Sequence, residues 1–316
     1  MDSGICARPS QGWSRAGHPC TLQGVAGDAR MSDRRFLAAN GRVARRDLKG
    51  IVDADLFTDG KVYSLAETAW LLHSPGGRAV RQLTFGDRFV ELDREGGWSF
   101  GYSSKDGYVG HVESACLDRA FRPTHRVAVR STFALANASI QALPVRDLHL
   151  NSEVRVTERS GAWCRITSRD RMYVPAAHLA ELDSGDGDVV GWARVMLGTP
   201  YVWAGNSGFG IDCSGLVQAA FHAAGLECPP DSDLQEAMPG ERLSATDALN
   251  AGDLVFWNGH VAIAGGEGTL IHANAHHMSV VEEPTETAAA RIAATDTGSV
   301  TSRLRPTRVT RLWHGP

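Results

Sequence analysis

The chain has 316 residues, of which 43% are hydrophobic and 22% are charged, and its formal net charge is -4. This length suggests two or three folded domains, and eight Trp and ten Phe exclude a disordered chain. The near-neutral charge argues against a nucleic-acid-binding protein, and no apolar run reaches the roughly 20 residues that span a bilayer.

The amino-terminal segment, residues 1–58, has the composition of a largely flexible tail. Its first 30 residues contain no apolar block typical of a signal peptide, so we expect a cytoplasmic protein. Met31 is an alternative start to Met1. The basic residues between positions 34 and 49 are expected to be solvated rather than to contact nucleic acid or membrane. Six cysteines without a CxxC pair are typical of reduced thiols.

Two similar segments follow, and they predict two small β-barrels. A Tyr-Val pair lies ten residues after Trp98 and again ten residues after Trp163. Alternating apolar residues upstream of each Trp are typical of a half-buried strand. We expect one barrel over residues 59–121 and a second over 122–183. Each is too small for an extensive core, so they should pack on each other or on a third domain.

A Gly/Asp-rich linker precedes a third domain, residues 184–316, whose most informative segment is a helix beginning near Asp212. Asp212 is the expected N-cap, and Gly225 lies just beyond the expected end of the helix. Cys213 then falls in the first turn, where unpaired backbone N–H groups stabilise a thiolate and lower the pKa of the thiol. A free cysteine is also often a small buried apolar residue, so position alone leaves both interpretations open.

Downstream strands bring two histidines into one region. The expected strands are 252–257, 260–264 and 269–274. If the last loop consists of residues 265–267, His260 lies directly opposite His272 on the same face. One imidazole would then accept the thiol proton, and the second imidazole would fix the tautomer of the first. A four-residue loop would shift the register by one residue and remove this pairing.

Other chemistries have weaker support in the sequence. A zinc site with His276 and His277 lacks a CxxC or HxxxH element, so we expect no metal. A serine nucleophile at Ser214 is disfavoured because the GxSxG pattern is absent. The remaining cysteines downstream of the tail are expected to pack in the core or to lack activation: Cys116, Cys164 and Cys228.

Five motifs in the third domain resemble, in order and spacing, those of the NlpC/P60 cysteine peptidases. They are Gly198-Thr-Pro-Tyr-Val-Trp203, Asp212-Cys-Ser-Gly-Leu-Val217, Gly252-Asp-Leu-Val-Phe-Trp257, Gly259-His-Val261 and Ile271-His-Ala-Asn274. The resemblance covers residues 189–290, and the two upstream segments resemble bacterial SH3 domains. It implies an α+β fold in which a papain-like catalytic domain is preceded by two SH3-like β-barrels.

The resemblance also implies roles for individual residues. Cys213 matches the nucleophile, His260 the general base and His272 the polar residue that orients it. The positions that match substrate contacts are Tyr108, Trp203, Asp212, Ser214, Asp231 and Ser232. Tyr108 could instead be a barrel-core aromatic. Pro230 stands where the family often has Arg, which puts any contact of that guanidinium in doubt.

The architecture is similar to that of bacterial γ-D-glutamyl-L-diamino acid endopeptidases. The implied activity is hydrolysis of L-Ala-γ-D-Glu-L-diamino acid peptides from murein, with release of L-Ala-D-Glu for recycling. Acidic and phenolic acceptors in a closed pocket suit the free amine of such a tri- or tetrapeptide. No metal or organic cofactor is required. An amidase or acyltransferase with the same Cys–His pair, and a non-catalytic protein that binds wall peptides, are the alternatives. The sequence leaves open whether the diamino acid is lysine or meso-diaminopimelate, and the oligomeric state.

Overall fold

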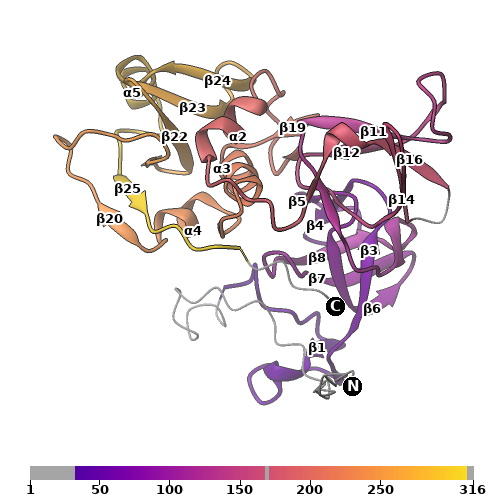
Figure 1. The fold of residues 1–316 in the computed structure, drawn as a ribbon. Coiled ribbons are helices and arrows are strands. Elements are labelled where there is room, and N and C mark those ends of the chain that lie inside the picture. The colour runs from indigo at the N-terminus through magenta and orange to yellow at the C-terminus, as the bar shows by residue number, and fades with distance from the viewer. Residues whose placement is uncertain (1–32, 168–170, 312–316) are drawn as a thin grey trace, which may run out of the picture.

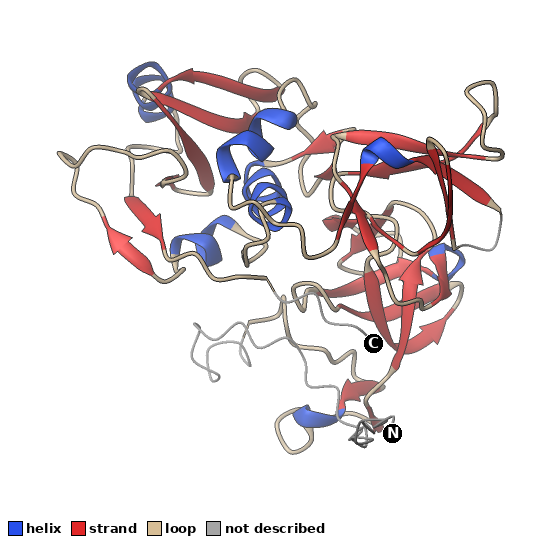
Figure 2. Ribbon diagram, viewed as in Figure 1, coloured by secondary structure: helices blue, strands red, loops and turns tan. Residues whose placement is uncertain are grey.

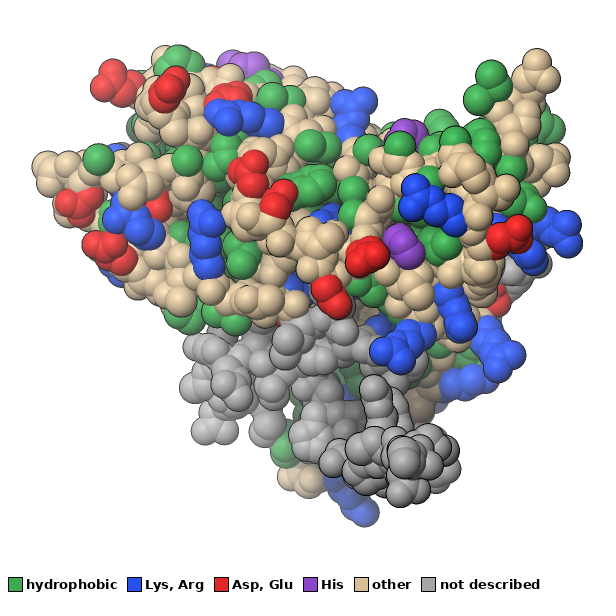
Figure 3. All heavy atoms as spheres, in the orientation of Figure 1, with side chains coloured by type: hydrophobic (Ala, Val, Ile, Leu, Met, Phe, Trp, Pro, Cys, Tyr) green, Lys and Arg blue, Asp and Glu red, His purple; other side chains and the backbone are tan. Residues whose placement is uncertain are grey.

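The computed structural model describes residues 33–167 and 171–311, which form three units. Two strand-rich units and a third unit that carries most of the helices lie side by side (Figures 1 and 2). Charged side chains of both signs are interspersed over the face in Figure 3. Within the described residues, no helix has both the length and the apolar character needed to cross a membrane.

Residues 33–58 pack against the first barrel instead of forming the expected flexible tail. Strands β1 (Val43–Arg45) and β2 (Leu56–Thr58) pair in parallel, with a short 3-10 helix (Arg46–Leu48) between them. Buried Val43 and Leu48 share a core cluster with Phe100 of the barrel. The expectation is wrong here because apolar residues spaced among the arginines find an apolar barrel face to cover. Residues 1–32 lie outside the described part of the chain.

The first barrel is a seven-stranded antiparallel sheet with the order β5-β4-β8-β7-β6-β3-β9. Its strands are β3 (Lys61–Leu65), β4 (Ala69–Leu72), β5 (Ala79–Leu83), β6 (Arg88–Glu95), β7 (Trp98–Ser103), β8 (Val109–Glu113) and β9 (Leu117–Arg119). Inward-facing residues such as Leu71, Leu83 and Phe89 are fully buried, as period-2 alternation requires.

The second barrel has a five-stranded sheet, β12-β11-β16-β15-β14, and a three-stranded sheet, β13-β10-β17. Its strands are β10 (His125–Val127), β11 (Ser131–Leu135), β12 (Pro144–His149), β13 (Glu153–Val154), β14 (Val156–Ser160), β15 (Trp163–Ile166), β16 (Met172–Pro175) and β17 (Leu179–Glu181). Trp98 and Trp163 each begin a strand that pairs with the strand carrying the following Val. The repeat detected in the sequence therefore corresponds to equivalent hairpins.

The third unit packs helices on a six-stranded antiparallel sheet with the order β20-β25-β21-β22-β23-β24. The strands are β20 (Gly240–Arg242), β21 (Leu254–Trp257), β22 (His260–Gly266), β23 (Thr269–Asn274), β24 (Ser279–Pro284) and β25 (Ser302–Pro306), with the short pair β18 (Asn206–Ser207) and β19 (Gly210–Ile211) beside them. The helices are α2 (Val189–Val195), α3 (Cys213–Ala223), α4 (Ser232–Glu236) and α5 (Thr285–Ala293).

Helix α3 is buried along its whole length, because the sheet and both barrels surround it. From the second barrel, Asn151 Nδ2 donates to the carbonyl of Ala219 at 2.9 Å, and Arg126 Nη2 donates to the carbonyl of Ala223 at 2.8 Å. Both expected caps are confirmed: Asp212 Oδ1 accepts from the Gly215 N–H at 2.6 Å, and Gly225 has φ +80°. The fold thus places the start of α3 where all three units meet.

Candidate active site

Cys213 occupies the first turn of α3, as predicted, but the environment of its sulfur differs from the prediction. Burial, helped by Asp212, raises the pKa of the Cys213 thiol to about 12, against the lowering effect of the backbone N–H groups of Val261, Ser214 and Cys213. The expected lowered pKa is wrong because desolvation of the thiolate outweighs these donors. The thiol is protonated at neutral pH, so nucleophilic attack requires a base. The Val261 amide also places the sulfur beside the start of β22, where His260 lies.

The two histidines are in direct contact, although in a different register from the predicted one. His260 Nε2 lies 2.8 Å from His272 Nδ1. Ile263 pairs with Ile271, and a bulge precedes the pair Gly266–Thr269, so extending the register sets His272 opposite position 262 rather than His260. The prediction of direct opposition is therefore wrong by two residues. Because side chains alternate between faces, a two-residue shift keeps both rings on one face, and they meet diagonally.

Glu283 on β24 extends this pair to a third side chain that the sequence analysis did not detect. His272 Nε2 lies 2.7 Å from Glu283 Oε1, and Arg291 of α5 donates to the same oxygen. An ionised carboxylate only accepts hydrogen bonds, so His272 Nε2 carries its proton and His272 Nδ1 accepts from His260 Nε2–H. This assignment, made from the network, leaves Nδ1 of His260 unprotonated. No motif marks Glu283, because only the pairing of β23 with β24 brings it to His272.

Both imidazoles are neutral over the physiological range of pH. Burial, reinforced by His272, lowers the pKa of His260 to about 3. Burial also lowers the pKa of His272, although Glu283 opposes the shift. A neutral imidazole with a free ring nitrogen can accept a proton, so the resting pair is a thiol and an imidazole rather than a thiolate and an imidazolium.

We expect alkylation of Cys213 by iodoacetamide to accelerate about tenfold per pH unit between about pH 7 and 10, without levelling off. The sign follows from the raised pKa: the reactive thiolate forms only as pH approaches that high value. The measurement is the pH dependence of the labelling rate by mass spectrometry, with Cys213→Ala to subtract the other thiols. A rate that stays constant down to about pH 5 would instead show a preformed thiolate–imidazolium pair.

Tyr108 and Asp231, two predicted substrate contacts from different units, meet in the structure. The Tyr108 hydroxyl donates to the Asp231 carboxylate, and burial together with Asp231 raises the pKa of that phenol. The Tyr108 ring also belongs to the core cluster of the first barrel. The ring thus packs in the barrel core while the hydroxyl reaches the third unit, and a contact of Tyr108 with substrate stays a prediction.

The other predicted contacts lie around the start of α3 and α4. Asp212 is saturated by local donors, since it also accepts from the Ala204 N–H at 2.9 Å and from Ser214 Oγ at 3.2 Å. Trp203 is 73% exposed, and Ser232 is the first residue of α4. A role of these residues in substrate binding stays a prediction.

Two polar side chains beside the site, one buried and one partly buried, were not predicted as site residues. Arg81 of β5 is 2% exposed; its Nε donates to Asp106 at 3.0 Å, its Nη1 donates to the carbonyl of Pro230 at 3.3 Å, and its Nη2 donates to Gln218 of α3. A guanidinium therefore does reach position 230, but from the first barrel. The phenol of Tyr201 interacts electrostatically with Cys213: burial, Cys213 and Asp212 raise its pKa to about 12.

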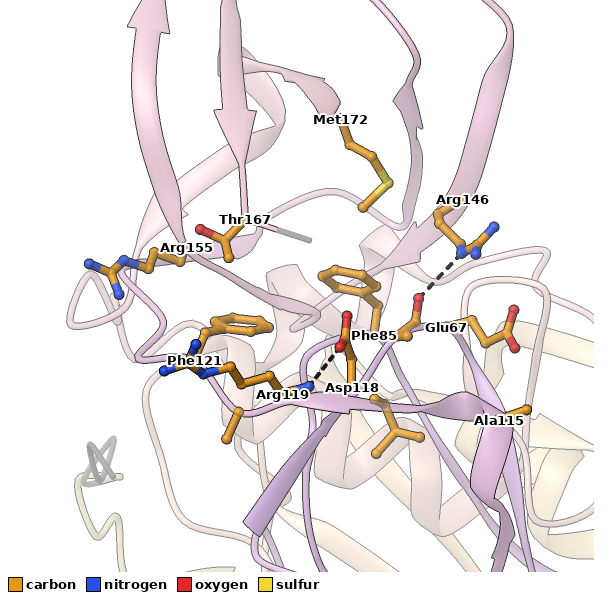
Figure 4. Close-up of a pocket in the computed structure, with 13 residues that line it drawn as sticks. Glu67, Phe85, Ala115, Asp118, Arg119, Phe121, Arg146, Arg155, Thr167 and Met172 are labelled. Carbon is orange, nitrogen blue, oxygen red and sulfur yellow. Dashed lines mark hydrogen bonds between the residues drawn. The ribbon is translucent and has the colours of Figure 1, made fainter. Parts of the chain in front are cut away.

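A cavity of about 490 Å³ lies between the two barrels, and it contains none of the predicted site residues. Figure 4 shows the rings of Phe85 and Phe121 along it and Arg146 bonded to a backbone carbonyl, that of Ala66. Within residues 33–167 and 171–311, no three His, Cys, Asp or Glu side chains are grouped so as to hold a metal ion.

Comparison with known proteins agrees with this architecture. Residues 198–295 match the NlpC/P60 family, and residues 71–117 match the bacterial dipeptidyl-peptidase SH3 domain. A gamma-D-glutamyl-L-lysine dipeptidyl-peptidase of Bacillus cereus is 26% identical over 265 residues, which cover 74% of this chain and 78% of the relative. The protein of the same name from Bacillus subtilis is 26% identical over 212 residues, which cover 61% and 71%.

A crystal structure of an NlpC/P60 family protein from Bacillus cereus superposes with a TM-score of 0.63 at 18% identity, covering 78% of this chain and 99% of that one. The family match and the named relatives identify a hydrolase of the cysteine peptidase class. More specifically, the chain contains an NlpC/P60 catalytic domain preceded by an SH3 domain of the bacterial dipeptidyl-peptidase type. The predicted fold class and family are confirmed.

Proposed function

We propose that this peptidase hydrolyses the γ-D-glutamyl bond of L-Ala-γ-D-Glu-L-diamino acid peptides and releases L-Ala-D-Glu. The observation that carries the proposal is the hydrogen-bonded series Glu283–His272–His260, together with the backbone N–H of the next residue, Val261, which bonds the buried sulfur of Cys213. The names of the two Bacillus relatives support the choice of bond. A role in recycling murein peptides in the cytoplasm is part of this proposal.

In the proposed reaction, Cys213 Sγ attacks the γ-carbonyl carbon while His260 Nδ1 accepts the thiol proton. The oxyanion forms near the helix start, where the Cys213 backbone N–H has no partner within the helix and can donate to it. The intermediate collapses, the C–N bond breaks, and His260 returns its proton to the leaving amine. Water, deprotonated by His260, then hydrolyses the thioester and regenerates the thiol, with the dipeptide carboxylate as product.

Substrate length is set, in this proposal, by the first barrel. Tyr108 and Asp231 provide phenolic and carboxylate oxygens at its junction with the third unit. Such oxygens suit an α-ammonium group, which has three donors and no acceptor. A pocket closed behind that group admits two residues before the scissile bond and rejects a blocked amine.

The test is mass spectrometry of the products from L-Ala-γ-D-Glu-L-Lys and from the meso-diaminopimelate tripeptide, each with a free and with an acetylated amino terminus. We expect L-Ala-D-Glu and the free diamino acid from the unblocked peptides, and at least about 100-fold slower cleavage after acetylation, because the acetylated nitrogen loses its positive charge and two of its three donors. Equal cleavage of both forms would favour the amidase or acyltransferase alternative. Binding without any cleavage would favour the non-catalytic one.

A further inference from the structure

Residues 33–36 reach from the first barrel to the third unit and form an ion-pair cluster there. Arg35 Nη1 donates to Asp231 Oδ2 at 2.8 Å and to Asp233 Oδ1 at 2.8 Å, while its Nη2 donates to Asp233 Oδ2 at 2.7 Å. Asp33 Oδ2 accepts from the same guanidinium, also at 2.7 Å. One Arg thus bridges two carboxylates of α4 and its N-cap to a segment almost 200 residues away in the chain.

The same segment also fixes the other half of the Tyr108–Asp231 pair. The Val109 N–H donates to the Arg35 carbonyl at 2.8 Å, which ties the backbone next to Tyr108 to the segment. The Phe36 ring packs edge-to-face on Tyr108, with centroids 6.0 Å apart. Both members of the predicted acceptor pair are therefore held by neighbouring residues of one short segment.

The charge balance of the cluster suits a cationic ligand. One guanidinium, that of Arg35, pairs with three carboxylates, those of Asp33, Asp231 and Asp233. The guanidinium of Arg81 also interacts with Asp231, but it is ion-paired with Asp106, so a net negative charge remains. Without Arg35, like charges on Asp231 and Asp233 would repel, and Asp231 would keep only the neutral Tyr108 hydroxyl of its two side-chain donors named here. The side chains of Arg35 and Asp231 are 27% and 24% exposed, so solvent reaches part of this ion pair.

We propose that Arg35 is a positioning and specificity residue of the substrate site: it orients Asp231 and Tyr108 as acceptors for the free α-ammonium group of the substrate. The amino-terminal segment is then part of the binding pocket, although it lies outside both barrels and the catalytic domain. This inference rests on the proposed function. It concerns recognition of the first residue and leaves the chemistry of Cys213 unaffected.

The test compares Arg35→Gln with Arg42→Gln in steady-state assays on L-Ala-γ-D-Glu-L-Lys. Arg42 is the matched control: it follows this segment within the region 33–58, and it ion-pairs with Asp93 and Glu95, both at 2.6 Å, on the first barrel. We expect Arg35→Gln to raise KM by about 10–100-fold, the value of one charged hydrogen bond, with kcat nearly unchanged. Its preference for the free over the acetylated peptide should fall by a similar factor. Arg42→Gln should change neither quantity.

Several results would overturn the inference. The inference is wrong if Arg35→Gln leaves both KM and the preference for the free amine unchanged. It is also wrong if Arg35→Gln lowers only kcat, or if Arg42→Gln raises KM as much as Arg35→Gln does. If Arg35→Gln fails to fold, Arg35→Lys keeps the charge but not the two-pronged contact, and a KM equal to the wild-type value would count against the inference. Wild-type protein that cleaves no tripeptide would defeat the proposed function and this inference together, whereas an active wild type with an unaffected Arg35→Gln defeats this inference alone.

Discussion

Replacement of Cys213 by alanine is expected to reduce the release of L-Ala-D-Glu by about 10⁴–10⁶-fold, to the limit of detection. The reason is chemical: in the proposed mechanism the thiol of Cys213 forms the thioester, and a methyl group cannot replace it. The measurement is product formation by mass spectrometry at high enzyme concentration. Substrate binding by Cys213→Ala should survive, because the truncated thiol takes no part in the Tyr108–Asp231 pair.

The matched control is Cys116→Ala. This thiol lies in the first barrel and bonds only weakly to Glu67, at 3.4 Å, so its loss should leave turnover within about twofold. Turnover by Cys213→Ala at a tenth of the wild-type rate or more would refute the thiol mechanism. Comparable losses in both variants would mean that cysteine removal damages the fold rather than the chemistry.

Replacement of Glu283 by glutamine is expected to lower kcat by about 10²–10⁴-fold with KM unchanged. The carboxylate forces His272 Nε2 to carry a proton, and that choice sets the tautomer of His260. A glutamine amide can rotate and donate to His272 instead. His272 Nδ1 would then donate to His260 Nε2, and Nδ1 of His260 would carry the proton, so that it could no longer accept one from the thiol.

Two control variants at neighbouring residues distinguish a change of the histidine tautomer from a general loss of charge. Glu282→Gln removes the adjacent carboxylate, which pairs with Arg194 at 2.8 Å at the surface, and should leave kcat within about threefold. Arg291→Gln removes the ion-pair partner of Glu283 but keeps the carboxylate, so its effect should be small beside that of Glu283→Gln. If Glu283→Gln retains full kcat, the tautomer argument is wrong. If Arg291→Gln matches its loss, charge rather than tautomer is responsible.

Helix α3, which carries Cys213, is held by both barrels as well as by its own unit. Arg81 bonds Gln218 and the Pro230 carbonyl from the first barrel, and Asn151 bonds the Ala219 carbonyl from the second. This arrangement explains why most side chains of helix α3 are small or apolar. A solvated face, as in an ordinary amphipathic helix, would leave the barrels without a surface to pack on.

Local sequence patterns were sufficient for the elements that carry the chemistry. The spacing from Asp212 to Gly225 predicted α3 and both of its caps, because capping depends on residues a few positions apart. Alternation over residues 260–264 and 269–274 predicted β22 and β23 and set both histidines on one face. The face to which a side chain points alternates with each residue along a strand. A register wrong by two residues therefore left the predicted face of both histidines correct.

Contacts between distant segments and the effect of burial required the tertiary structure. Glu283, Arg35 and Arg81 reach the site from a third strand, from the amino-terminal segment and from a barrel, and no local spacing encodes such approaches. The position of Cys213 at a helix start predicted a lowered pKa, but the packing of the chain around the thiol raises it. Solvent exclusion at the junction of three units is a property of how the whole chain packs, and it outweighs the few backbone donors that one helix terminus provides.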